Sequence, residues 1–154
     1  MSDAAVLALV DRQEITDLIH AYCDCFDRND PEGVAALFTD DAVLDYGPEF
    51  DNIVGREAIA PTIAVGLERT FAATSHHVSN IQITLESSDD ARSLSYLYAW
   101  HRYRDGSPDG YLWGRYVHRF RREHGGWLIA ELLLQAAGTV DFHRAAMHPI
   151  GRRQ

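Results

Sequence analysis

The 154-residue chain contains no lysine, so all 14 of its basic side chains are arginine. This absence excludes catalysis through a lysine Schiff base and leaves histidine, aspartate, glutamate, tyrosine and cysteine as candidate acids and bases. The chain also has no glycine-rich phosphate-binding loop and no GxSxG turn. Nucleotide binding and serine-hydrolase chemistry are therefore not indicated.

The residue spacings typical of metal sites are missing as well. There is no HxH, HExxH or metal-type cysteine pair, and although strands could bring His76, His101 and His118 together, we predict no metal centre. Cys23 and Cys25 lie two residues apart on a predicted helix and so point to nearly opposite sides. They are poorly placed to share a metal or a disulfide, and Cys23 is predicted to be a small core residue.

No hydrophobic run approaches the length of a membrane span, and the N-terminal sequence MSDAAVLALVDRQE lacks the basic region of a signal peptide. We therefore predict a cytoplasmic protein without membrane contact. The net charge of −9 and the scattered arginines argue against nucleic-acid binding. The length predicts one domain over residues 1–154, in which a tail over residues 137–154 packs along the sheet or stays mobile.

Hydrophobic periodicity predicts helices first and strands second. Apolar residues three and four apart indicate a long helix that begins at Asp3 or Asp11 and ends near Asn29. Shorter elements follow: a helix after Asp30-Pro31, a strand over 42–46 and a helix over 56–70. Long strands are predicted over 75–86, 91–104, 111–123 and 127–135, joined by turn residues. This order predicts an α+β fold in which a curved antiparallel sheet covers the helices.

Two acidic residues, Asp24 and Asp27, occupy the last turn of the first predicted helix. The negative end of the helix dipole raises the proton affinity of a carboxylate there unless a cation offsets it. Both residues can be read as solvated charges or caps. The functional interpretation is that Asp27 faces a cavity, as a general base or as the partner of a histidine.

The candidate partner lies in the run SHHVSN, at the start of the first long strand. Neighbouring side chains in a strand face opposite sides, so only one of His76 and His77 can point toward the helices. Alternation counted back from the apolar residues 81, 83 and 85 places His77 inside, whereas a bulge near Val78 places His76 inside. The pattern alone leaves both possibilities open.

Aromatic residues gather on the predicted strands. Tyr96, Tyr98 and Trp100 share one face of the second long strand, and His101 and Tyr103 share the other. A face of the third long strand carries Leu112, Gly114, Tyr116, His118 and Phe120. Most of these side chains are expected in a core or an oligomer interface, and those that line a cavity would hold an apolar substrate.

Several segments together resemble a known family, the SnoaL-like, scytalone-dehydratase-like branch of the nuclear-transport-factor-2-like superfamily. They are AYCDCFDRND, ALFTDDAVLDYG, VGREAI, SHHVSN and GRYVHRFRREHGGWLIAE, and the resemblance covers residues 3–141. It implies a cone-shaped barrel of three helices packed in a strongly bent sheet around a deep cavity. It also implies removal of a proton next to a leaving or migrating group, without a metal or an organic cofactor.

The resemblance also implies roles for individual residues. The family aspartate at the end of helix one matches Asp27, and the family histidine, four residues before the strand asparagine, matches His76. A tyrosine five residues before the aspartate matches Tyr22. One departure concerns the last strand, where the family often has an arginine and this chain has the run 131–134, Glu-Leu-Leu-Leu, which implies a more apolar cavity floor.

We therefore predict a cofactor-independent lyase, of the dehydratase or related elimination or retro-aldol type, or an isomerase, acting on a small apolar or aromatic molecule. The predicted catalytic residues are Asp27, His76 and Tyr22. The predicted substrate-binding residues are Tyr46, Tyr98, Trp100, Leu112, Tyr116 and His77. The alternative is a non-catalytic ligand-binding protein or the small subunit of a ring-hydroxylating dioxygenase. A homo-oligomer, a dimer or a trimer, is expected.

Overall fold

A computed structural model describes residues 2–151 of the chain. The helices are α1 (Asp3–Asp27), α2 (Pro31–Ala36) and α3 (Arg56–Arg69). The strands are β1 (Phe38–Asp45), β2 (Ile53–Val54), β3 (Phe71–Leu85), β4 (Asp90–Tyr103), β5 (Gly110–Glu123), β6 (Gly126–Val140) and β7 (His148–Pro149). The predicted helices and long strands are all present, and β6 continues to Val140 instead of ending near residue 135.

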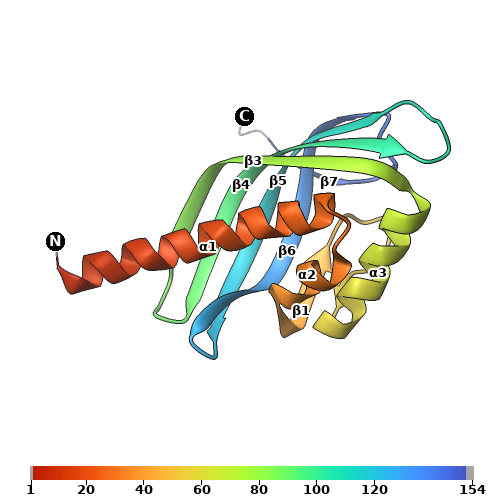
Figure 1. The fold of residues 1–154 in the computed structure, drawn as a ribbon. Helices are drawn as coiled ribbons and strands as arrows, with labels where there is room; N and C mark the ends of the chain where they lie inside the picture. Colours follow the sequence, from red (N-terminus) through yellow and green to blue (C-terminus); the bar gives the residue numbers. More distant parts are fainter. Residues whose placement is uncertain (1, 152–154) are drawn as a thin grey trace.

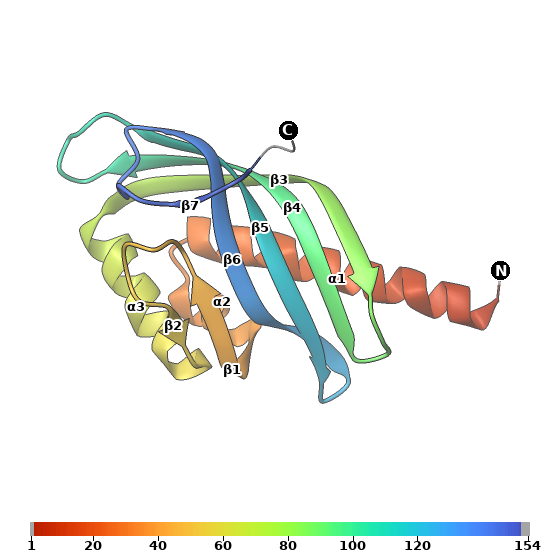
Figure 2. The ribbon, with the colours of Figure 1, turned by 180° about the vertical axis from the view of Figure 1, so that it is seen from behind.

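The strands form a curved sheet in the order β2-β1-β6-β5-β4-β3, with β7 alongside β6. Helix α1 lies across the concave side of this sheet, and α2 and α3 cover one end of it (Figure 1; Figure 2 shows the opposite side). The predicted α+β class and the cone-like shape are confirmed. The sheet is mixed instead of wholly antiparallel, because β1 and β7 each run parallel to β6.

Helix α1 packs one apolar stripe against the sheet and ends at Asp27, where polar turn and capping residues follow. Its buried residues are Ile15, Ile19, Tyr22 and Cys23, three and four residues apart as the periodicity predicted. After Asp27 the chain reverses through Asn29, which adopts a positive φ of 58°, and Asp30 caps α2 by accepting a hydrogen bond from the backbone of Gly33. No helix in the described part of the chain is both long and apolar enough to cross a membrane.

An irregularity in β3 decides which of its side chains face α1. The pairing of β3 with β4 shifts register between Ser79 and Gln82, and Asn80 between them has a positive φ of 50°. The extra residue reverses the inside-outside alternation of the strand at this point. As a result His76 faces the interior and His77 is exposed, so the count back from the apolar residues gives the wrong histidine.

The segment after β6 returns across the sheet instead of leaving it. Strand β7 pairs with β6 through His148, whose Nε2 lies 2.9 Å from a carboxylate oxygen of Asp45. The Glu49 carboxylate accepts a hydrogen bond of 2.7 Å from the backbone N–H of Ala145. Of the two arrangements considered for the tail, residues 141–151 therefore adopt the packed one.

Candidate active site

A cavity of about 120 Å³ lies between α1, α3, the concave side of the sheet and the segment after β6. Its wall is mainly aromatic and aliphatic, including Phe26, Phe71, Leu112, Leu134 and Phe142. Such a wall favours apolar ligands, and the few polar groups in the wall determine the orientation of a bound ligand. Leu134 lines the cavity and Glu131 is exposed, in keeping with the apolar floor expected from the last strand.

One polar group on the wall is His76, whose imidazole ring contacts Asp27. Asp27 Oδ1 lies 2.6 Å from Nδ1 of His76, and Oδ2 accepts the backbone N–H of His76 at 2.8 Å. The hydroxyl of Thr74 donates to Asp27 Oδ1 at 2.8 Å. The side chains of His76 and Asp27 are only 7% and 24% exposed. Because Nδ1 donates to the carboxylate, Nε2 is the ring nitrogen left to accept a proton.

The electrostatics of Asp27 support this arrangement. Burial alone would raise its pKa, but the hydrogen bonds and charge of His76, with the hydroxyl of Thr74, outweigh burial and lower the pKa below the ordinary value. The carboxyl group is therefore ionised at neutral pH. An ionised carboxylate fixes the imidazole tautomer and stabilises the imidazolium that forms when His76 takes a proton.

Three tyrosines stand near this pair. The hydroxyl oxygens of Tyr22 and Tyr46 lie 2.7 Å apart, and the ring of Tyr116 packs edge-on against Tyr22. Burial raises the pKa of Tyr46 to about 12 and raises that of Tyr22 and Tyr116 well above the usual range. All three stay protonated near neutral pH, so their hydroxyls can donate hydrogen bonds to a substrate oxygen.

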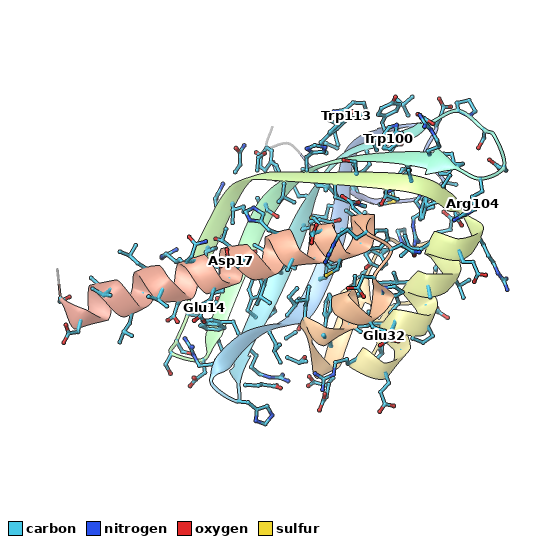
Figure 3. The ribbon with its side chains drawn as sticks, viewed as in Figure 1. Glu14, Asp17, Glu32, Trp100, Arg104 and Trp113 are labelled. Carbon is cyan, nitrogen blue, oxygen red and sulfur yellow. The ribbon has the colours of Figure 1, made fainter. Side chains whose placement is uncertain are left out.

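Three of the predicted substrate-binding residues lie elsewhere. In the pairing of β3 with β4, His77 is opposite Tyr98, and both face away from the helices, as does Trp100, whose indole N–H donates to Asp109. Figure 3 shows Trp100 on the outer side of the sheet, away from α1. Contrary to the prediction, His77, Tyr98 and Trp100 do not line the cavity. The structure does bring Tyr22, Tyr46, His76, Leu112 and Tyr116 together there.

His101 lines the cavity although the sequence reasoning gave it no role there. Its ring centroid lies 5.3 Å from that of His76, it is 4% exposed, and burial lowers its pKa to about 3. Strand alternation places His101 on the face opposite that of Tyr98. The sequence could therefore have indicated His101 as a cavity residue if the outward orientation of Tyr98 had been known. Phe142, His143 and Arg144 also reach the cavity, from a segment with no periodic pattern.

The buried histidines predict a loss of stability in mild acid. Burial lowers the pKa of both His101 and His118 to about 3, from an ordinary value of 6.5. Above pH 6.5 both are neutral in the folded and unfolded states, so their contribution to stability is fully present. Below it only the unfolded chain gains protons, and the free energy of unfolding falls by about 1.4 kcal/mol per pH unit for each histidine.

Urea denaturation at about pH 7, 6 and 5 measures this slope. In the variant His118→Leu the slope should fall by roughly a third, because one of three such groups is removed: burial also lowers the pKa of His143 to about 4. The exposed His20 provides a control as His20→Gln. An unfolding free energy that stays constant between about pH 7 and 5 would contradict the prediction.

Within residues 2–151, no three His, Cys, Asp or Glu side chains form a cluster of the kind that holds a metal ion. The described structure thus defines an α+β cone in which a histidine at the wall of an apolar cavity is hydrogen-bonded to an aspartate outside that wall. The sequence model of the SnoaL-like domain family matches residues 8–132. The chain therefore belongs to this family, which is part of the nuclear-transport-factor-2-like superfamily. The resemblance seen in the sequence is confirmed.

Solved structures agree with this assignment. A protein from Novosphingobium aromaticivorans DSM 12444, provisionally named a scytalone dehydratase, is 37% identical to this chain. The two structures superpose with a TM-score of 0.89, and the match covers 96% of this chain and 97% of that protein. A protein from the same species, provisionally named an aromatic ring hydroxylase, is 27% identical, with a TM-score of 0.76 over 82% and 88% of the two chains.

The fold extends to more distant proteins. Hexachlorocyclohexane dehydrochlorinase LinA-type3 from Novosphingobium barchaimii LL02 is 18% identical, with a TM-score of 0.80 over 98% of this chain and 100% of its own. At that identity the similarity concerns the fold alone. No protein with a curated function matches the sequence.

Proposed function

We propose that this protein is a cofactor-independent lyase of the dehydratase type, or an isomerase that moves the same proton, with His76 as its general base. The observation that carries the proposal is the 2.6 Å contact between His76 Nδ1 and Asp27 Oδ1 at the wall of an apolar cavity. An imidazole oriented in this way can take a proton from a carbon atom and return it to a leaving group. Asp27 acts as a positioning residue that also balances the charge of the imidazolium.

The proposed elimination balances within the site. Nε2 of His76 takes a proton from a carbon next to a carbonyl, and the C–H electron pair becomes a carbon-carbon double bond while the carbonyl oxygen gains charge. When the carbonyl reforms, the electron pair of that double bond moves to the bond between this carbon and its other neighbour. The bond from that neighbour to its hydroxyl breaks, and the hydroxyl leaves as water with the proton from His76. In this proposal a hydroxyl group of Tyr22 or Tyr46 donates a hydrogen bond to the charged oxygen, and the apolar wall strengthens that interaction.

The proposed substrate is a small apolar or aromatic molecule. Aromatic and aliphatic side chains make up most of the cavity wall, and one 37%-identical neighbour is provisionally named a scytalone dehydratase. A second candidate function, in which the chain binds a ligand or joins a larger dioxygenase without catalysis of its own, draws support from the 27%-identical neighbour named for aromatic ring hydroxylation.

One probe compound tests the proposal. We expect the full chain to convert 3-hydroxy-1-tetralone to 1-naphthol with loss of one water, and to do so equally well with EDTA present. Mass spectrometry and ultraviolet absorbance follow the product. Saturable binding of the probe without any product would contradict the lyase proposal. Co-purification with a larger iron-sulfur protein would then favour the second candidate.

A further inference from the structure

Arg144 brings a positive charge to the cavity from a part of the chain outside the helices and long strands. It lies between β6 and β7 and forms part of the cavity wall. Its guanidinium carbon stands 5.7 Å from the ring centroid of Tyr46 and 4.9 Å from that of Phe50. Aromatic faces attract a cation in this way and leave the N–H groups at its edge free to bind an acceptor.

One nitrogen atom of the Arg144 guanidinium lacks an acceptor. Nη1 of Arg144 is buried and has no hydrogen-bond partner in the described structure. The Glu49 carboxylate, which belongs to the segment between β1 and β2, accepts backbone N–H groups of Ala145 and Ala146. Asp27 is occupied by His76 and Thr74. A buried guanidinium nitrogen without an acceptor is costly, and a ligand that supplies one is bound in preference to a ligand that does not.

The segment that carries Arg144 is held in place on the side of β1. His148 contacts the carboxylate of Asp45 at 2.9 Å, and Glu49 binds the backbone next to Arg144. Gly47 lies so close that a Cβ atom there would stand 3.2 Å from the carbonyl oxygen of Ala146. The guanidinium is therefore positioned before a ligand arrives, and little ordering is needed on binding.

We propose that Arg144 makes the cavity a site for apolar or aromatic molecules that carry a carboxylate group. A planar carboxylate matches the paired N–H donors of a guanidinium, and the rest of the wall suits an apolar body. The carboxylate acts as a handle and does not take part in the bond changes. This inference rests on the proposed function for the chemistry at His76 and deepens it by naming the substrate class. Binding alone can test it.

Isothermal titration of the full chain compares 1-naphthoate with 1-naphthamide, which has nearly the same shape but no charge. We expect the wild type to bind the carboxylate about 10- to 100-fold more tightly than the amide. Arg144→Gln should remove this preference while affinity for the amide stays the same, and Arg144→Lys should keep part of it. Circular dichroism and thermal unfolding confirm that each variant is folded.

Arg115 supplies a matched control, since its guanidinium also lies over a tyrosine ring, that of Tyr96, but on the outer face of the sheet. Arg115→Gln should keep the full preference for 1-naphthoate. Equal affinities in the wild type, no binding of either probe, or a preference that survives in Arg144→Gln would each overturn the proposal. The variant His76→Ala should still bind 1-naphthoate more tightly than 1-naphthamide, because His76 does not bind the carboxylate. A wild-type protein that prefers the carboxylate but has no lyase activity would refute only the proposed function.

Discussion

Replacing His76 by alanine is expected to lower turnover by about 100- to 10,000-fold, the usual contribution of a positioned general base. The variant should fold, because Asp27 keeps its hydrogen bonds to the backbone N–H of residue 76 and to the hydroxyl of Thr74. Steady-state kinetics on a converted probe and circular dichroism measure the two effects. The substitution leaves room beside Phe26, whose ring centroid lies 5.1 Å from that of His76, so a modest drop in melting temperature is also expected.

His77 is the natural control for this experiment. It is adjacent in sequence and of the same residue type, but it is exposed on the other face of β3. His77→Ala should therefore keep most of the wild-type turnover. Wild-type turnover in His76→Ala, or an equal loss in the two variants, would remove the assignment of His76 as the base.

Asp27→Asn is expected to lower turnover by about 100-fold or more and to destabilise the fold. The carboxylate accepts three hydrogen bonds, two from His76 and one from Thr74, and hydrogen bonds to a charged group each contribute about 1.5–3 kcal/mol. An amide has one acceptor oxygen and no charge, so it neither fixes the His76 tautomer as firmly nor stabilises an imidazolium. Kinetics and urea denaturation of the purified variant measure both losses.

The same variant changes how stability depends on pH. The pKa of Asp27 is lowered in the folded protein from an ordinary value of 3.8, so its contribution to stability is present above that pH and is lost as the pH falls toward the folded value. Asp27→Asn should lack this acid-dependent loss. Asp24→Asn is the control, because Asp24 lies one turn earlier, is 63% exposed and pairs with Arg28. Similar turnover and stability in Asp27→Asn and the wild type would contradict the role of the carboxylate.

Much of this architecture could be predicted because the responsible signals are local. The stripe that includes Ile15 and Ile19 depends on helical spacing, and the break after Asp27 depends on the Asp30-Pro31 pair that starts α2. The pairing of Asp27 with His76 followed from a family motif. The parallel alignment of β1 with β6 could not be predicted, because it joins residues almost 90 positions apart, such as Leu44 and Leu132, and no short-range pattern encodes such a register.

The errors at the site have the same physical origin. Tyr98 and Trp100 were assigned to the cavity because aromatic side chains suit an apolar substrate, but the face they occupy depends on how β4 pairs with β3. Arg144 was missed because its position depends on contacts of its own segment with Asp45 in β1 and with Glu49, about a hundred residues earlier. Residue type indicated the chemistry of the site, whereas tertiary pairing determined which residues of each type reach it.

The additional residue in β3 could be lost without turning the histidine. Asn80 and Ile81 stand together against a single residue of β4, Ser95. If Asn80 were deleted, Ile81 alone would pair with Ser95, and His76 would keep its place opposite Ala99 on the inner face. The cross-strand partner in β4, and not the number of residues back to the hairpin, therefore determines which imidazole faces the cavity.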